Sequence, residues 1–560
     1  MNRTTPAPIS SQLQPDLLDI PLPRTLILAN WLKALAFYPQ RHIAELAIHD
    51  IKFGADVLYH GPLANRNSHN LPSAIDHPEA VDEHLRKETA AGRIFGPTES
   101  RPANPFIVSP IGSVPKKDSD EWRIIHHLSW PVNNSVNDWI HDQPLSYTTF
   151  DNAIALVRKL GVGCFLSKVD VKSAFRTIAV NKRCRFLLGM RWRGKFYADL
   201  SLPFGMKSSP GIWERFATLA EWVVRGNGVE AILHYVDDYL IGGRSAAECQ
   251  AALDTVVKVF QYLGIPINPS KFAAEGLPLT RIRFLGIIID TVAMVAQLDD
   301  DRLRDIRAKL ESWTQRQNCS VPELRSLIGT LSFAAKVVPA GRTFIRRLLI
   351  TLTAALSRAS TTTVNLTREF RCDIAWWQKF IATWNGVAIL PDPFWSSPPA
   401  AIAPDAPVDH LFTDACLTGF GAVFGPHWLA EKWTASILQT AQRNSAVSMP
   451  YLELYAVAAA VATWGKSLRG RKLLVHSDSA TAVAVMAGAT SPDHSLMDLV
   501  RSILFVAATH EFAIRLAHIS GVDNACADAL SRGQIEKFRS RYAKHVSFPT
   551  AVLPPPLHAW

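Results

Sequence analysis

The amino-acid sequence predicts an α+β protein built from several domains, and three observations support this prediction. The chain has 560 residues, several times the roughly 150 residues that one domain usually takes. Short β-branched runs alternate with helical patterns in residues 102–290 and again in residues 410–532, which is typical of mixed sheet and helix. Six prolines lie between Pro391 and Pro407, and such a stiff stretch indicates a linker between the two regions.

Composition excludes several classes of protein. Hydrophobic residues make up 48% of the chain and aromatic residues 9%, which is enough for packed cores and argues against general disorder. The 7 cysteines form no CxxC pair, which excludes zinc knuckles and disfavours a disulfide scaffold. The opening stretch is rich in proline, and no charge-free apolar run approaches about 20 residues, so neither a secretory signal nor a membrane helix is expected. We therefore expect a reduced, soluble protein inside the cell, in the cytoplasm or the nucleus, with no membrane partner.

Outside the two α/β regions the sequence predicts mainly helix. Residues 26–54 and 77–92 have helical patterns, and Glu83, Lys87 and Glu88 are expected on a solvated face of the second helix. Residues 301–385 are rich in arginine and predict a helical, basic connection. The whole chain carries 59 Lys and Arg against 49 Asp and Glu, a net charge of +10, which permits a nucleic-acid partner without demonstrating one. The tail from Ser547 contains three consecutive prolines and is predicted to be disordered.

The first group of acids lies in strand-like sequence. Asp237 and Asp238 interrupt the apolar run AILHYVDDYLIGG of residues 231–243, which predicts a hairpin with carboxylates at its turn. Two like charges against an apolar strand are unfavourable unless a cation compensates them, although an isolated Asp-Asp pair is also typical of an exposed turn. Asp170 lies in a second such run, FLSKVDVKSAF. Three carboxylates on neighbouring strands suit two Mg²⁺ ions of a nucleotidyl-transfer site.

These motifs resemble a known family. YVDD, preceded by VDVKSAF and by LPFGMKSSP, resembles the palm of a retroelement reverse transcriptase. The resemblance implies that Asp170, Asp237 and Asp238 are metal ligands. It also implies that Phe175 is the aromatic gate that rejects a 2′-hydroxyl, with Ala174 beside it in the sugar pocket. A core aromatic is the alternative role for Phe175.

Further segments resemble the nucleotide and primer contacts of that family. KKDSDEWR of residues 116–123 resembles the fingers hairpin, which implies that Lys116 and Arg123 grip the incoming triphosphate; a solvated basic turn is the alternative. Phe204 stands where some retroviral relatives carry glutamine, and we expect it to pack against template or nucleotide.

Two later segments complete the implied polymerase site. Lys271, in GIPINPSK, is expected to protonate the leaving pyrophosphate. The segment Phe284-Leu285-Gly286 resembles the strand that holds the primer end, so Leu285 and Gly286 are the expected primer grip.

A second group of acids follows the proline linker. Asp414 lies in a strand, Glu453 begins an Ala-rich helix, Asp478 ends another strand, and Asp528 lies in a helix with Asn524 as its expected N-cap. Each alone would also suit a cap or a surface charge.

Together these acids resemble the RNase H fold. The resemblance implies that Asp414, Glu453, Asp478 and Asp528 hold two Mg²⁺ ions and hydrolyse the RNA strand of a hybrid. His518, in HISGVDNACAD, matches the mobile histidine of that family, which would move a proton during turnover. A structural histidine is the alternative, and Asp523 is expected to be a loop acid.

The resemblance implies a right-hand polymerase followed by an RNase H-like α/β domain, with two Mg²⁺ ions in each active site and Mn²⁺ as a substitute. The implied partners are an RNA template, a DNA primer, RNA–DNA hybrids and dNTPs. The expected parts are an N-terminal leader that is partly helical (1–95), fingers and palm (96–290), a helical, basic thumb and connection (291–390), a proline-rich linker (391–407), an RNase H-like domain (408–535) and a C-terminal tail (536–560).

The type of element and the activity leave alternatives. The segment WRIIHHLSWPVNNSVND of residues 122–138 is similar to DIRS-type retrotransposons, and gypsy-like elements are the nearer alternative. A DIRS-type element would encode a tyrosine recombinase, which this chain does not contain in recognisable form. A catalytically inactive, nucleic-acid-binding or scaffolding descendant is disfavoured because all seven acids are present. A DNA-templated polymerase with a proofreading-like nuclease is disfavoured by the RNase H motifs.

Overall fold

The structure of the protein is a computed structural model, which describes residues 15–557 except 116–120, 270, 273–275, 339, 358–362, 383–386, 389–407, 444–445, 470, 490, 492 and 543–547. The chain divides into two compact units. The N-terminal unit comprises residues 1–282 and 291–293, and the C-terminal unit comprises residues 283–290 and 294–560. Lys116 and the proline-rich linker lie outside the described residues. No described helix is long and apolar enough to cross a membrane.

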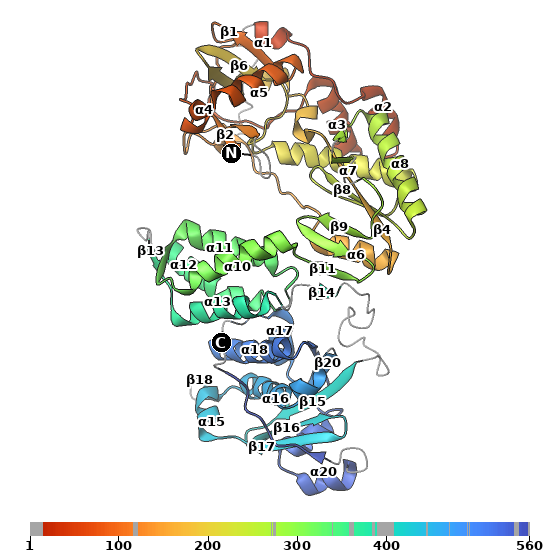
Figure 1. Ribbon diagram of the computed structural model, residues 1–560, viewed down its shortest axis with the longest axis vertical. Coiled ribbons are helices and arrows are strands. Elements are labelled where there is room, and N and C mark those ends of the chain that lie inside the picture. Colours follow the sequence, from red (N-terminus) through yellow and green to blue (C-terminus); the bar gives the residue numbers. More distant parts are fainter. Residues whose placement is uncertain are drawn as a thin grey trace, which may run out of the picture. The chain divides into compact units, whose positions relative to one another are not determined.

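The N-terminal unit contains a small layer of strands with helices packed beside it (Figure 1). Its elements are α4 (Pro72–Asp76), α5 (Pro78–Ala90), β1 (Ile94–Thr98), β2 (Ile111–Pro115), β3 (Trp122–His126), β5 (Gly189–Trp192) and β6 (Lys195–Asp199). The strands form a sheet of order β1-β6-β5 and a hairpin β2-β3. Helix α5 buries Val81 and Leu85 against Ile94 and Ile111. This apolar face fixes α5 over both sheets.

The second sheet of this unit has the order β4-β8-β7. Its strands and covering helices are β4 (Phe165–Asp170), β7 (Ile232–Tyr235), β8 (Asp238–Gly243), α6 (Phe150–Leu160), α7 (Ser209–Gly226) and α8 (Ala246–Leu263). The central strand β8 is buried from Tyr239 to Gly243, which explains why its sequence is apolar without alternation. Thr149 and Asn152 form a capping box at the start of α6, and Gly264 ends α8 in a left-handed conformation, as glycine there permits.

The segment expected to be a leader is part of this core. Helices α1 (Pro15–Asp19), α2 (Leu28–Ala34) and α3 (Arg41–Phe53) precede the sheets. Trp31 is fully buried and donates from Nε1 to the carbonyl oxygen of Leu263 at 2.9 Å. The buried Arg185 donates to the carbonyl oxygens of Leu17 and Ile20. The start of the described chain is therefore packed onto the sheet domain.

Trp31→Ala should destabilise the N-terminal unit by about 3–5 kcal/mol, because it removes a fully buried indole and leaves a cavity. The unfolding free energy from urea denaturation measures this change. The matched control is Leu32→Ala, since the neighbouring side chain is 51% exposed and its loss should change stability by less than about 0.5 kcal/mol. Equal effects of the two substitutions would contradict the packing of α2 described here.

The C-terminal unit begins with a sheet of order β14-β11-β10-β9 and a group of helices. These elements are β9 (Arg281–Phe284, which starts in the N-terminal unit), β10 (Ile287–Asp290), β11 (Val295–Gln297), β14 (Val387–Ala388), α10 (Asp300–Thr314), α11 (Val321–Ala334), α12 (Arg346–Leu356) and α13 (Arg368–Phe380), with a short ribbon of β12 (Asn318–Ser320) and β13 (Thr363–Asn365). The prediction of a helical stretch over residues 301–385 agrees with these helices.

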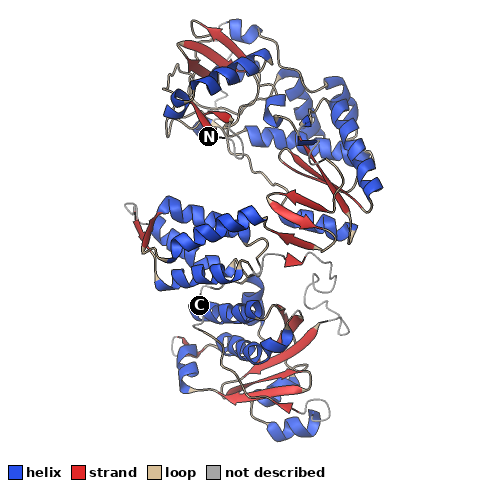
Figure 2. Ribbon diagram, in the orientation of Figure 1, coloured by secondary structure: helices blue, strands red, loops and turns tan. Residues whose placement is uncertain are grey.

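A six-stranded sheet follows, in the order β21-β20-β15-β16-β17-β22. Figure 2 shows its strands with helices on both sides. The strands are β15 (Asp409–Ala415), β16 (Gly419–Phe424), β17 (His427–Lys432), β20 (Lys472–Ser477), β21 (Ala513–His518) and β22 (Phe548–Pro549). The neighbouring elements are α15 (Ala435–Ala441), the pair β18 (Gln442–Arg443) and β19 (Ala446–Val447), α16 (Met449–Trp464), α17 (Ala480–Gly488), α18 (His494–Thr509), α19 (Ala525–Ser531) and α20 (Ile535–Tyr542).

Strands β15, β16 and β17 are antiparallel, whereas β15, β20 and β21 are parallel. Helix α16 lies against β15 and β16, and every residue from Tyr451 to Val461 is buried. A helix that is apolar on all sides is expected in such a position. Glu453 is the one acid in this buried run, so its environment needs explanation.

Two sequence expectations are wrong. The tail from Ser547 was expected to be disordered, but in its described part Phe548 and Pro549 pair in parallel with β17, and Val552 and Leu557 pack on the core. Proline is compatible with this edge position because the amides of residues 548 and 550 make the hydrogen bonds. Glu88 was expected on a solvated face, but its side chain is only 13% exposed and is paired with Arg93 and Arg176.

Candidate active sites

Three acids of the N-terminal unit meet at the end of the β4-β8-β7 sheet. Asp170 ends β4 and lies directly opposite Asp238, which begins β8. Asp237 lies in the tight turn between β7 and β8, and its neighbour Val236 has a φ of 55°. A β-branched residue rarely adopts this left-handed conformation; here Trp213 donates to the Val236 carbonyl oxygen at 2.7 Å and anchors the turn. The hairpin predicted from the sequence therefore brings all three predicted acids to one edge.

The charges at this edge are only partly compensated. Burial, together with Asp237 and Asp170, raises the pKa of Asp238 to about 6, and burial also raises the pKa of Asp237. Lys271 donates to Asp170 Oδ2 at 2.6 Å, and Asn268 donates to Oδ1 at 2.9 Å. Among the described residues, the cations near these three carboxylates leave the pKa values of Asp237 and Asp238 raised, which indicates excess negative charge that a divalent cation would relieve. The donor set, all carboxylate oxygens, suits Mg²⁺.

Two of the acids, Asp170 and Asp237, line a cavity of about 830 Å³ within the N-terminal unit, together with Arg123, Phe204 and Lys271. Three of the predicted nucleotide-binding residues are thus brought together with the acids.

Two further predicted residues lie in the short helix η3 (Ala174–Thr177). Ala174 is buried. Phe175 is half-buried, and the centroid of its ring lies 5.2 Å from that of Phe204. The same cavity is lined by Arg176, Asp199 and His126, which the sequence did not single out.

Leu285 and Gly286 form the turn between β9 and β10, with φ values of 49° and 76°. A Cβ at residue 286 would lie 3.2 Å from the ring of Phe333, so glycine is favoured by both conformation and space. The two residues belong to the C-terminal unit.

The second group of acids forms a compact site. The carboxylates of Asp414, Glu453 and Asp478 each offer an oxygen within 4.8 Å of the others. Asp414 comes from β15, Glu453 from α16, and Asp478 follows β20. This group does not include Asp528, whose Oδ1 accepts from Arg532 at 2.7 Å.

Electrostatics distinguish these acids from ordinary surface carboxylates. Burial, reinforced by Asp414 and Asp478, raises the pKa of Glu453 to about 9. Its Oε1 accepts from the amide of Ala415 at 3.3 Å, whereas its Oε2 is buried without a hydrogen-bond partner. Burial likewise raises the pKa of Asp414 to about 6. A buried, partly unpartnered carboxylate beside two others fits a cation site of the Mg²⁺ type.

The surrounding residues partly follow the sequence expectation. His518 ends β21, is exposed and is paired in register with Ser477, which precedes Asp478. Asn524 occupies the N-cap position of α19 but does not cap that helix. Its Nδ2 donates to the carbonyl oxygen of Thr413 at 2.9 Å, so Asn524 fixes the strand that carries Asp414. Ser531, which sequence reasoning missed, donates to Asp414 Oδ2 at 2.5 Å.

His234 ties the acid-bearing hairpin of the N-terminal unit to α7. Its Nδ1 lies 2.6 Å from Glu221 Oε2 and its Nε2 lies 3.0 Å from Glu214 Oε1. Burial alone would lower the pKa of His234, but these two carboxylates outweigh it and raise the pKa to about 9. The protonated ring therefore fills a doubly anionic pocket.

Stability should consequently fall as the pH rises from about 6.5 to 9. A histidine whose pKa is raised on folding stabilises the folded state fully when the pH is below its unfolded pKa. This stabilisation is lost as the pH rises through its folded pKa. The shift corresponds to about 3 kcal/mol. Urea denaturation at pH 6 and pH 9.5 measures it, with His234→Gln as the reference. If the wild type and the variant lose stability in parallel over this window, His234 is not the group responsible.

A family model matches the part of the chain that carries Asp170, Asp237 and Asp238. Residues 114–289 match the family model described as "Reverse transcriptase (RNA-dependent DNA polymerase)". The Transposon Tf2-3 polyprotein of Schizosaccharomyces pombe is 24% identical over 272 residues, which cover 48% of this chain and 18% of that polyprotein. Polyprotein P3 of Commelina yellow mottle virus is 25% identical over 272 residues, covering 48% of this chain and 12% of the relative. The chain thus matches less than a fifth of the length of either relative.

Among solved structures, a foamy viral protease–reverse transcriptase in complex with double-stranded DNA is similar, with a TM-score of 0.50 and 15% identity, covering 92% of this chain and 84% of that one. This likeness confirms the predicted fold class, an α+β polymerase fold followed by a further α/β domain. Residues 114–289 are a reverse transcriptase domain of the kind found in retroelement polyproteins.

Proposed function

We propose that the protein is an RNA-directed DNA polymerase of a retrotransposon that also hydrolyses the RNA strand of RNA–DNA hybrids. The observation that carries the proposal is the meeting of Asp170 and Asp237 in one cavity with Arg123 and Lys271, with Asp238 directly opposite Asp170 on the neighbouring strand. Anionic ligands for a metal and cations for a triphosphate are the two requirements of nucleotidyl transfer. The proposed substrates are dNTPs on an RNA template with a DNA primer.

In the polymerase site, Asp170, Asp237 and Asp238 would hold two Mg²⁺ ions, with Mn²⁺ as a substitute. When bound, these ions lower the pKa of the attacking hydroxyl and stabilise charge on the transferred phosphoryl group. Arg123 binds triphosphate oxygens with its planar fork, together with Lys116. Lys271, whose pKa is raised by Asp170 against the effect of burial, carries the proton that the leaving pyrophosphate needs.

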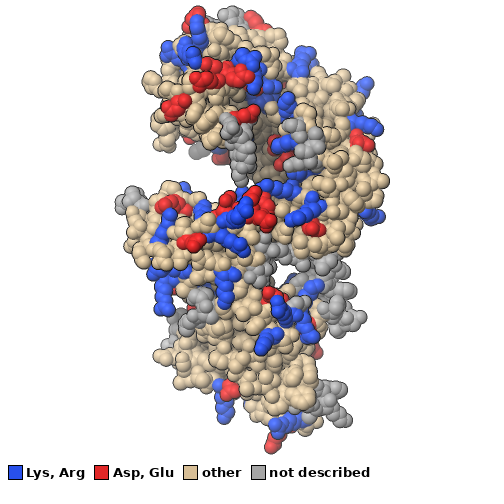
Figure 3. Space-filling view, viewed as in Figure 1, with Lys and Arg blue, Asp and Glu red and all other residues tan. Residues whose placement is uncertain are grey.

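The remaining polymerase residues select and orient the substrates. Phe175 excludes the 2′-hydroxyl, with Ala174 lining the sugar pocket, and Phe204 packs against template or nucleotide. Leu285 and Gly286 hold the primer end. The face of the N-terminal unit seen in Figure 3 is hollowed, and Lys and Arg side chains lie beside the hollow. Such charges favour a phosphate backbone without reading its sequence.

In the second site, Asp414, Glu453, Asp478 and Asp528 would hold two Mg²⁺ ions for hydrolysis of the RNA strand. The buried, unpartnered Oε2 of Glu453 is the observation that supports a cation there. Asp528 would have to leave Arg532 to join the other acids. The exposed His518, next to the strand end that carries Asp478, would move a proton between the site and solvent.

We assign the element to the DIRS type, with a gypsy-like element as the alternative, and expect a tyrosine recombinase to be encoded separately. The seven cysteines are free, which fits the reducing cytoplasm or nucleus. An inactive, nucleic-acid-binding descendant is the rival function, and a DNA-templated polymerase is the second.

Primer extension tests the proposal. The purified chain should extend a DNA primer on an RNA template with dNTPs in Mg²⁺, and EDTA should abolish the extension. It should also cleave the RNA of a labelled hybrid but not the same RNA alone. Absence of extension under all metal conditions would favour the inactive descendant. Extension on a DNA template alone, without hybrid cleavage, would favour the DNA-templated polymerase.

A further inference from the structure

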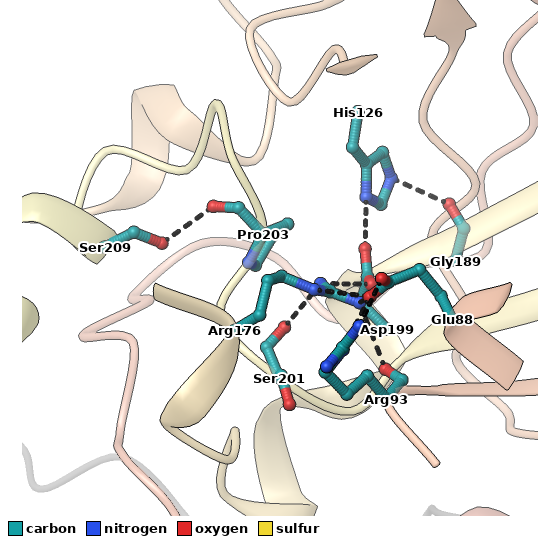
Figure 4. Close-up of polar contacts among 9 residues, drawn as sticks. All are labelled: Glu88, Arg93, His126, Arg176, Gly189, Asp199, Ser201, Pro203 and Ser209. Atoms are coloured by element: carbon teal, nitrogen blue, oxygen red, sulfur yellow. Dashed lines mark hydrogen bonds and ion pairs between the residues drawn. The ribbon is translucent and has the colours of Figure 1, made fainter. Parts of the chain in front are cut away.

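A buried ionic cluster lies beside the polymerase cavity, which Glu88, His126, Arg176 and Asp199 help to line; Figure 4 shows its polar contacts. Its members come from separate elements of the N-terminal unit: Glu88 from α5, Arg93 before β1, His126 from β3, Arg176 from η3 and Asp199 from β6. The side chains of Arg176 and Asp199 are 7% and 4% exposed. None of the proposed catalytic roles uses these residues.

Arg176 is the centre of the cluster. Its Nη1 donates to Asp199 Oδ1 at 2.6 Å and to the Ser201 carbonyl oxygen at 3.2 Å. Its Nε and Nη2 lie 3.0 Å and 2.9 Å from Glu88 Oε2, and Nη2 also donates to the Arg93 carbonyl oxygen at 3.3 Å. A guanidinium has five N–H donors, and these contacts use the whole fork. Lysine has three donors and a different geometry, so it cannot reproduce this set.

The contacts of Arg176 join the two turns that carry the aromatic rings of the sugar pocket. On one side, Arg176 directly follows Phe175 in η3. The residue before this helix, Ser173, has a left-handed conformation with a φ of 53°. Such a strained start needs support from the surrounding structure. On the other side, Ser201 lies three residues before Phe204. The next anchor on that side is the hydrogen bond from Ser209 Oγ to the Pro203 carbonyl oxygen at 2.9 Å (Figure 4).

The charges of the cluster hold it together. Burial alone would raise the pKa of Asp199, but Arg176 and His126 outweigh it and lower the pKa. The two ring nitrogens of His126 face Asp199 Oδ2 at 3.0 Å and the Gly189 carbonyl oxygen at 3.2 Å. The carboxylate of Asp199 therefore has hydrogen-bond partners on both η3 and β3. Removing Arg176 would leave buried acids without their main partner, and the turns would relax apart.

We infer that Arg176 is a positioning residue that fixes the rings of Phe175 and Phe204, whose centroids lie 5.2 Å apart, and thereby sets how strictly the site selects deoxyribonucleotides over ribonucleotides. This inference rests on the proposed polymerase function. Rejection of a single hydroxyl by a ring is steric, so a shift of about 1 Å in the ring is enough to change it. The rings contact the sugar, whereas Arg176 acts through them.

The chain offers a matched control for a purely structural role. Arg185 is a second buried arginine of the same unit, and it donates to the backbone carbonyls of Leu17 and Ile20 rather than to the segments that carry Phe175 and Phe204. Loss of either guanidinium should lower stability. Only loss of Arg176 should change sugar selection.

The test compares kcat and KM for a dNTP and its matching rNTP on an RNA template, in the full chain with Mg²⁺. Phe175→Ala serves as the positive control. Arg176→Met should lower the dNTP-to-rNTP ratio of kcat/KM by about tenfold or more, mainly by lowering KM for the rNTP, and Arg176→Lys should lower it less. Arg185→Met should leave the ratio within about twofold of the wild type.

An unchanged ratio in both Arg176 variants would overturn the inference while leaving the proposed function intact, and so would an equal fall in Arg185→Met. If Arg176→Met does not fold, Arg176→Lys decides the comparison alone. A wild type that incorporates no nucleotide at all would overturn the proposed function and this inference together.

Discussion

Asp237→Asn should reduce dNTP incorporation on a primed RNA template by on the order of a thousand-fold or more, because it removes one carboxylate from a site proposed to hold two metal ions. The substitution keeps the size of the side chain and its place in the turn between β7 and β8. Burial and the neighbouring Asp170 raise the pKa of Asp237, so a neutral amide relieves repulsion there. We therefore expect the folded protein to be as stable as the wild type, or more so.

Single-turnover primer extension measures the loss. Asp254→Asn is the matched control, since Asp254 is an exposed acid on α8 and its replacement should leave extension unchanged. Hybrid cleavage by the Asp237→Asn variant should also persist, because the second group of acids is untouched. Extension by Asp237→Asn at the wild-type rate would remove Asp237 from the proposed site.

The sequence predicted those features that depend only on residues close together in the chain. An acid inside an apolar strand-like run, as at Asp170 and Asp414, indicates by itself that a charge is held where charges are costly. The paired acids Asp237 and Asp238 mark a turn because the run on each side is long enough for a strand. The structure has these elements at the expected places, and it brings Asp414, Glu453 and Asp478 together.

What the sequence did not reveal depends on partners far away in the chain. Arg176 is like any other arginine in sequence, and its burial follows only when Glu88 and Asp199 approach from elements 88 and 23 residues away. The helical pattern places Glu88 on a polar face, which is correct, but the fold covers that face with Arg176. The tail was assigned from its prolines, which do not exclude an edge strand such as β22.

Glu453→Gln should have opposite effects on stability and on hybrid cleavage. Without metal, burial and the two neighbouring acids raise the pKa of Glu453 to about 9. A carboxyl whose pKa is raised on folding costs stability that grows as the pH rises from its unfolded pKa towards its folded pKa. At pH 7 this cost is about 3 kcal/mol, and the neutral glutamine amide avoids it. In EDTA the variant should therefore be more stable than the wild type, by up to that amount, and the difference should vanish near pH 4.

In Mg²⁺ the wild type should instead be more stable than Glu453→Gln. A cation bound by three carboxylates stabilises the folded wild type by mass action, whereas in the variant the cation has one carboxylate ligand fewer. Hybrid cleavage should fall by on the order of a thousand-fold, whereas primer extension should be unchanged. Thermal denaturation with and without Mg²⁺ and cleavage of a labelled hybrid measure the two effects. Glu431→Gln is the control, since Glu431 is an exposed acid on β17 of the same sheet. If Glu453→Gln were less stable than the wild type in EDTA, the acid would serve as a structural partner of the Ala415 amide, and no cation would be needed to explain its burial.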